Sequence, residues 1–512
     1  MKNKSMEHRT FINTAVGGLS FLVTMGQSII LVPILLKYWG STYYGLWLMA
    51  FAGFNMLQTL VLGFQNFVGN ELNVMYHSDL ELFKKTLGSG LRIVYLVGFL
   101  EFGFCLFLVI SGNLSNFLSI PNDLIAKHRI GLGLLLLMAM WWTLGSGCGI
   151  ISRIMMPAGL LCENIWFDIL AKLVQFALFV VIAVYGGSIL AVCISYAIVQ
   201  SIMILYRIWY LRFKLPQFFP WWRHGDWHYG FHILRKSLML AFNSIFTQLS
   251  NNGLLIFISA LFTSAVIPSF TTLRTLINSA TTVTNILMTS LLPDMMRFHA
   301  TRDIEKIKAV INANWFISGL CVNFCIIILL PVIEKIYNIW TKGILLFNGP
   351  LFLLLSATIS LTNFGAGLTT YLSGINDLRS QTYIAAGRFG TLFIVAYLLS
   401  RQFGILSVGI GLVVSELVAS VVLPILFVNR CFAVSMTSLS KRQIVLAIIP
   451  PTLLLSVGLI STVSSVRLEF ITLVMVPTFI VLYYINWMWL NTAVKDKIAG
   501  FIVVIMHKFA IR

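Results

Sequence analysis

Long apolar stretches alternate with short polar ones along almost the whole chain. Each apolar stretch is close to the roughly 20 residues that a helix needs to cross a bilayer. The pattern predicts fourteen membrane-spanning helices, at about 11–36, 43–69, 87–110, 130–151, 164–185, 188–206, 237–262, 270–293, 310–332, 345–372, 382–400, 405–428, 443–462 and 470–490. The first is too long for the apolar core of a signal peptide and is therefore expected to stay uncleaved. The expected fold is an all-α polytopic membrane protein.

The composition and the placement of charge agree with this fold. The chain is 58% hydrophobic and only 10% charged, whereas soluble domains carry about 25% charged residues. With the amino terminus in the cytoplasm, 24 of the 35 Lys and Arg residues lie in cytoplasmic stretches, 7 in outer loops and 4 within spans. This bias predicts that both termini are cytoplasmic. Because the basic residues lie in short loops between spans, the net charge of +18 does not indicate a nucleic-acid partner.

A weak internal repeat suggests two halves of the chain. The spacing D-x-E-x-x-K occurs at Asp79 and again at Asp303, each time at the start of the helix that follows a pair of spans. We predict two six-helix lobes, 1–206 and 237–428, in parallel repeat about a pseudo-two-fold axis along the membrane normal. The remaining parts would be a basic, aromatic cytoplasmic linker (207–236), two additional helices (429–490) and a cytoplasmic amphipathic tail (491–512).

The stretch 270–292 carries an unusual polar stripe. Hydroxyl and amide side chains recur at steps of three and four residues, which places them on one helix face together with Arg274; they are Thr271, Thr275, Asn278, Thr282 and Asn285. Since charged residues in spans usually face a bundle interior or a watery cavity, we interpret this helix as a cavity wall with Arg274 as its anion-binding group. The alternative is a polar contact between helices, with Arg274 reaching the membrane surface.

Other spans carry polar residues that would suit a sugar, which needs many hydrogen-bond partners. Candidates are Asn55 and Gln58 on the second span and Asn251 on the seventh. Arg388 and Glu416 are expected to pair across two helices, so Arg388 is either a structural partner or part of the site.

Two further acids in spans are less easily assigned. Asp168 and Lys172 lie one turn apart and are placed to neutralise each other, whereas Glu101 has no evident partner. Any of these acids is either structural or a site for a coupling proton.

The chain shows no sign of enzymatic chemistry. It contains no GxxxxGK[ST], GxSxG or HExxH motif, and its outer loops are too short for an extramembrane catalytic domain. The seven cysteines lie in or beside apolar spans without a CxxC pair. His224, His228 and His232 have the spacing of metal ligands on a helix, but an interfacial segment is the simpler interpretation. We therefore expect no cofactor and no metal.

Three short stretches near the second span resemble a known family: Thr42–Trp47 (TYYGLW), Leu62–Asn66 (LGFQN) and Gly69–Leu72 (GNEL). They resemble the Wzx-type O-antigen flippases and polysaccharide exporters of the multidrug/oligosaccharidyl-lipid/polysaccharide (MOP) exporter superfamily. The family often has an acid before the glycine of LG, and here Val61 and Leu62 precede Gly63 instead. A role that the family gives to that acid is not carried over.

The resemblance implies a flippase, in the bacterial inner membrane, for an undecaprenyl-pyrophosphate-linked oligosaccharide such as an O-antigen repeat unit. It also implies alternating access and a cationic central cavity. The expected partners are the lipid-linked substrate, the bilayer, a coupling ion (H⁺ or Na⁺) and other membrane proteins of polysaccharide assembly. The alternatives are an ion-coupled drug or cation antiporter of the same superfamily and, from another class, a membrane glycan polymerase or ligase.

Overall fold

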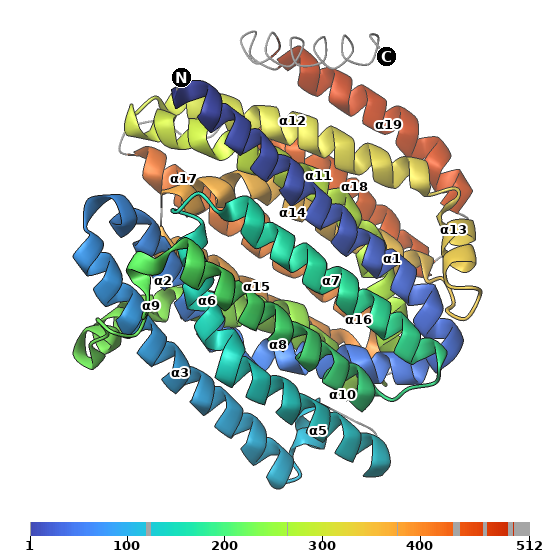
Figure 1. Cartoon of the computed structure of the whole chain (residues 1–512). Coiled ribbons are helices and arrows are strands. Elements are labelled where there is room, and N and C mark those ends of the chain that lie inside the picture. The colour runs from blue at the N-terminus through green and yellow to red at the C-terminus, as the bar shows by residue number, and fades with distance from the viewer. Residues whose placement is uncertain are drawn as a thin grey trace. The chain divides into compact units, whose positions relative to one another are not determined.

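The computed structural model describes residues 2–118, 124–263, 265–375, 377–433, 441–463, 468–489 and Lys495. Figure 1 shows that the regular elements in these ranges are helices. In the first part of the chain these are α1 (Lys2–Leu57), α2 (Thr59–Ser78), α3 (Leu80–Ile110), α4 (Leu114–Leu118), α5 (Leu124–Met140), η1 (Trp141–Gly145), α6 (Ser146–Ser152), η2 (Arg153–Met155), α7 (Leu161–Val184), α8 (Ile189–Lys214), η3 (Pro216–Phe218), α9 (Trp227–Gln248), η4 (Leu249–Gly253) and α10 (Leu254–Leu261). The rest are α11 (Val266–Ala300), α12 (Ile304–Leu329), α13 (Ile333–Trp340), α14 (Gly349–Gly374), α15 (Leu378–Phe403), α16 (Leu406–Glu416), η5 (Leu417–Val422), α17 (Leu423–Ala433), α18 (Lys441–Val463) and α19 (Leu468–Trp489).

The predicted all-α membrane fold is confirmed. Each of the fourteen predicted spans overlaps one helix or a run of consecutive helices. Among the described residues, ten helices are long and apolar enough to cross a membrane. α1 contains the whole first predicted span and the beginning of the second. Between them the helix is broken at Gly40, whose φ of +69° a glycine adopts without strain.

Contacts divide the chain into two compact units, Met1–Pro268 with Trp340–Leu345 (unit 1) and Ser269–Ile339 with Leu346–Arg512 (unit 2). α9 begins inside the predicted linker and packs against α2 and α3 of unit 1. The two six-helix lobes, the linker and the repeat axis stay predictions.

Unit 1 is built around α2, which packs against α3, α6 and α9. Gly63 lies so near α9 that a β-carbon there would come within 2.9 Å of its backbone. The Gln65 amide donates to the Ser146 carbonyl oxygen at 2.8 Å, and Asn66 accepts from Arg153 at 2.5 Å. Residues that carry the family resemblance therefore fix the packing of α2.

The chain between α8 and α9 is held against α3. Gly88 and Gly225 touch backbone to backbone, since a β-carbon on Gly225 would lie 2.7 Å from the Gly88 oxygen. The Asp226 N–H donates to Ser89 at 2.9 Å, and the Asp226 carboxylate pairs with Lys85 at 3.6 Å. These contacts place the start of α9 on unit 1.

Both copies of the D-x-E-x-x-K spacing open a helix in the same way. Asp79 and Asp303 are the N-caps of α3 and α12, each accepting an N–H from three residues on, at 2.9 and 3.2 Å. The Glu and Lys of each copy form an ion pair, at 3.5 Å in the first and 2.9 Å in the second. A hydrogen bond from Lys306 lowers the pKa of Asp303, so this cap is charged where the helix dipole favours an anion.

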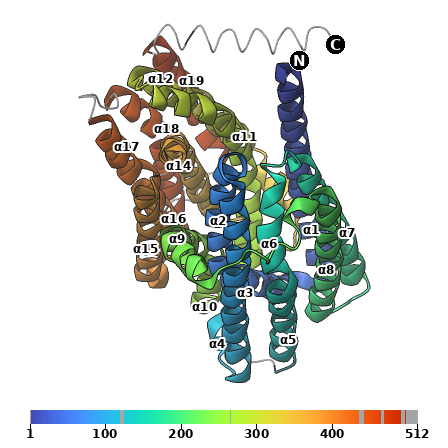
Figure 2. The same cartoon turned by 60° about the vertical axis from the view of Figure 1, so that its left-hand side comes forward.

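Unit 2 is built around α14, which packs against α12, α16, α18 and η5. Figure 2 shows α18 beside α14. Trp315 of α12 stacks on Phe364 with ring centroids 4.8 Å apart, and its indole N–H donates to the Phe364 carbonyl oxygen at 2.8 Å. Gly365 admits η5, because a β-carbon there would lie 2.6 Å from the Ser420 side chain. The close approach of α14 and η5 positions Ser420, which donates a hydrogen bond to the Glu416 carboxylate.

Three π-helical turns interrupt spans in the described chain: η1, η4 and η5. Such turns are rare and occur frequently at functional sites.

Candidate functional site

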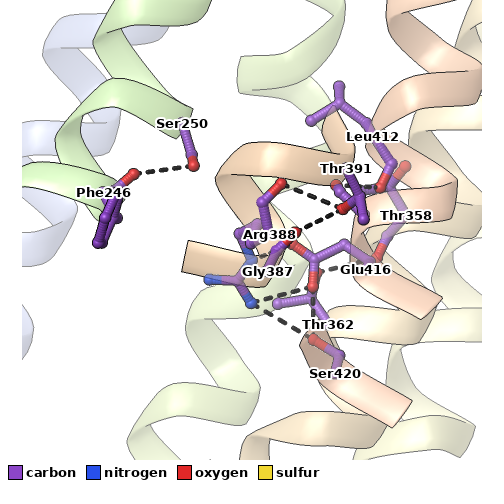
Figure 3. A network of polar contacts seen from close by, with 11 residues as sticks. Phe246, Ser250, Thr358, Thr362, Gly387, Arg388, Thr391, Leu412, Glu416 and Ser420 are labelled. Carbon is purple, nitrogen blue, oxygen red and sulfur yellow. Dashed lines mark hydrogen bonds and ion pairs between the residues drawn. The ribbon is translucent and has the colours of Figure 1, made fainter. Parts of the chain in front are cut away.

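A buried ion pair joins two helices of unit 2. Arg388 of α15 binds Glu416, the last residue of α16, through Nε to Oε1 at 2.8 Å and Nη2 to Oε2 at 3.1 Å (Figure 3). The Ser420 hydroxyl donates to the same carboxylate and lies 3.5 Å from Arg388 Nη2. Ser420 belongs to η5, so the π turn contributes a side chain to the cluster. The pairing of Arg388 with Glu416 predicted from the sequence is confirmed.

Arg274 belongs to the same cluster. It is half-buried on α11 and interacts electrostatically with both Glu416 and Arg388. Both guanidinium groups therefore interact electrostatically with one carboxylate. The three side chains carry a net charge of about +1 at neutral pH. The sequence placed Arg274 and Arg388 on separate helices, and the structure brings them together.

The polar stripe of α11 lies on the less buried side of that helix as far as it is described. Thr271 and Thr275 are half-buried and Asn278 is exposed, whereas Leu273 and Ile277 are buried. The side chains of Thr282 and Asn285 lie outside the described residues. In the described part of α11, this stripe is therefore not packed into the core of unit 2.

The predicted polar residues of unit 1 lie near two helix irregularities. Asn55 accepts from the Gln58 amide at 2.9 Å, at the joint between α1 and α2. Asn251 is exposed within the π turn η4, where Asn252 donates to Gln248 at 2.5 Å. The amides of Asn55 and Gln58 thus bond to each other, and Asn251 is exposed.

The sequence left Glu101 without a partner, and the structure places it in a cavity of unit 1. The cavity has a volume of about 280 Å³, and its polar lining comes from Glu101, Thr59 and Gln248 among apolar side chains. Glu101 is 4% exposed and accepts the Val61 backbone N–H at 3.0 Å. The only signal in the sequence was a single acid within an apolar span, which does not reveal a backbone partner on another helix.

The expected neutralisation of Asp168 by Lys172 is wrong. Asp168 pairs with Arg207 of α8 at 2.5 Å, because α7 and α8 pack side by side. Lys172 instead donates to the Thr24 hydroxyl of α1 at 3.0 Å. Spacing along one helix did not predict this pairing, since the competing partner comes from a neighbouring helix.

Metal ligands are not clustered in the part of the chain that the structure describes. No group of three His, Cys, Asp or Glu residues there is arranged to hold a metal ion.

Comparison with known proteins gives the fold. No protein-family model and no curated protein matches the chain. The chain is similar to the lipid II flippase MurJ in an inward closed conformation, with a TM-score of 0.64 and 11% identity over 93% of this chain and 98% of that one. It is also similar to the MATE multidrug transporter DinF-BH, with a TM-score of 0.61 and 12% identity over 83% of this chain and 96% of that one.

A third similar structure is an inward-facing multidrug resistance MATE family transporter of the MOP superfamily, with a TM-score of 0.59 and 17% identity over 82% of this chain and 96% of that one. At these identities the likeness shows the fold alone. The chain has the fold of MOP-superfamily transporters and flippases.

Proposed function

We propose that this protein is a flippase that moves an undecaprenyl-pyrophosphate-linked oligosaccharide across a bacterial inner membrane. The observation that carries the proposal is the excess positive charge of the unit 2 cluster, where Arg274 adds a second guanidinium to the Arg388–Glu416 pair. A guanidinium donates paired N–H groups to phosphate oxygens. The cluster thus suits an anionic headgroup better than a cationic one.

The remaining candidate residues suit the sugar part of such a substrate. Thr271, Thr275 and Asn278 extend from Arg274 along the less buried face of α11, and Asn251 offers an exposed amide in unit 1. Hydroxyls and amides both donate and accept hydrogen bonds. The headgroup would cross by alternating access while the isoprenoid tail stays in lipid, and the protein would act as a transporter rather than an enzyme.

The second candidate function is an ion-coupled antiporter of drugs or cations. Glu101 favours it, because this acid lines the unit 1 cavity. The MATE transporters with the same fold are described as multidrug transporters. A cationic substrate would however meet the positive cluster of unit 2, so we rank this function second.

The proposed orientation places both termini in the cytoplasm. Reporter fusions after Arg223, Arg302 and Lys441 are expected to report the cytoplasm, and a fusion at Gly112 the periplasm, because basic residues are retained inside. Paired alkaline phosphatase and green fluorescent protein fusions measure the side. A cytoplasmic signal at Gly112 would contradict the span count.

Reconstitution tests the proposed substrate class. Purified protein in liposomes should expose an undecaprenyl-pyrophosphate-linked oligosaccharide, initially in the inner leaflet, to a glycosidase added outside. Protein-free liposomes give the background rate. A lipophilic cationic dye serves as the competing substrate: movement of the dye without movement of the lipid-linked sugar would support the antiporter and overturn the flippase.

A further inference from the structure

Glu101 of unit 1 is a buried acid in a span, with a backbone hydrogen bond but no cation beside it among the described residues. Its Oε1 accepts the Val61 N–H at 3.0 Å. The backbone N–H of Leu60 and the indole of Trp141 also lie near the carboxylate, but Glu101 Oε2 and Trp141 Nε1 are both buried without a hydrogen-bond partner. No charged side chain of the described residues acts on Glu101. The cavity that it lines contains no second charged residue.

A second acid in this chain shows what an ion-paired carboxylate looks like at a similar depth of burial. Glu416 is 6% exposed, compared with 4% for Glu101. Glu416 binds the Arg388 guanidinium at 2.8 Å and also accepts from Ser420. The two acids are similarly buried and differ in their counter-charge, so a proton would replace the missing cation at Glu101.

The position of Glu101 ties its charge to the first turn of α2. The first four N–H groups of a helix have no partner within it, and Val61 is the third residue of α2. Gln58, the N-cap residue, provides no side-chain cap. Glu101 supplies the missing acceptor from α3, and a charged acceptor at a helix N-terminus is stronger than a neutral one.

We propose that Glu101 is a proton-binding site whose proton controls the joint between α1 and α2. The ionised carboxylate would hold the first turn of α2 firmly, and the neutral acid would hold it weakly. Protonation is thereby linked to the hinge between two spans, independently of what the protein carries. The cavity beside the carboxyl group is lined mainly by apolar side chains, with Thr59 and Gln248 as its other polar residues.

Labelling with dicyclohexylcarbodiimide, an apolar reagent for neutral carboxyl groups in membranes, tests the site on the unaltered protein. Glu101 should be modified, and its modification should fall as the buffer is made alkaline. Glu416 is the internal control and should be modified far less, because its carboxylate is ion-paired with the Arg388 guanidinium. Peptide mass spectrometry locates the label, and Glu101→Gln should abolish it. Equal labelling of the two acids, or labelling of Glu101 that ignores pH, would overturn the proposal.

Hydrogen exchange tests the link to α2. Amides of Thr59–Leu62 should exchange faster in acidic than in alkaline buffer after correction for intrinsic rates, and should lose this dependence in Glu101→Gln. Glu101→Asp should keep it. An unchanged dependence in Glu101→Gln would refute the control of the joint.

A third test measures translocation, and it rests on the proposed function. Translocation by Glu101→Gln should lose the pH dependence seen with the unaltered protein, and Glu101→Asp should retain it. A pH dependence that persists in Glu101→Gln would contradict the regulatory role. If the protein fails to move the lipid-linked sugar, labelling and exchange still decide whether Glu101 binds a proton, so the two proposals fail separately.

Discussion

Replacing Arg274 with alanine is expected to abolish translocation of the lipid-linked oligosaccharide while leaving the protein inserted at its normal level. Glu416 neutralises only one of the two guanidinium groups in the unit 2 cluster, so Arg274 supplies the excess positive charge. Arg274→Lys should keep part of the activity, since the charge persists while the forked geometry is lost. That loss should lower substrate affinity by about 1–2 kcal/mol, the scale of a charge-assisted hydrogen bond.

The control for Arg274 is Arg401→Ala, because Arg401 is exposed in the last turn of α15. Translocation is measured in proteoliposomes and divided by the amount of inserted protein. If Arg274 only supports the packing of α11, the alanine variant will show less protein but unchanged activity per molecule. That outcome would remove the anion-binding role.

Removing the carboxylate of Glu416 should lower the free energy of unfolding more than any other substitution proposed here. Glu416→Ala leaves Arg388 and Arg274 without their shared acid, and breaking a buried pair from one side costs about 3–5 kcal/mol. The Arg388 side chain is 27% exposed, so the loss should lie at the lower end of this range. The melting temperature of the purified protein measures it.

The matched variants separate charge from packing. Arg388→Gln should destabilise less than Glu416→Ala, because Glu416 keeps its interaction with Arg274. The double variant Arg388→Gln with Glu416→Ala should recover part of the stability, since no buried charge of that pair is then left alone. Additive losses in the double variant would show that the pair contributes through shape alone.

The helices and one ion pair were predictable because they depend on local pattern. Apolar runs of spanning length give the spans, and one basic and one acidic residue on successive spans, Arg388 and Glu416, gave the correct pair. Asp168 shows the limit of this reasoning. Its spacing favoured Lys172, but Arg207 on α8 is nearer in space, and helix packing is not readable from spacing along one helix.

The candidate site was predictable only in part. Arg274 stood out as a charge among hydroxyls, yet its neighbours Arg388 and Glu416 come from helices more than a hundred residues later. Glu101 was visible as an isolated acid, but its donor is the backbone of Val61. Backbone donors become available where a helix starts, and the start of α2 at Thr59 interrupts an apolar run that predicted a single span over 43–69.

The π turns have a consequence for chain length. A π turn holds about one residue more than the α turn that it replaces. Deleting one residue from η4 would convert that turn into an α turn and leave the helices on both sides facing as before. The same deletion in the middle of α14 would rotate everything beyond it by about 100°, since an α-helix has 3.6 residues per turn. Related chains are therefore expected to differ by single-residue insertions or deletions at η1, η4 and η5, and to keep a constant length through α14.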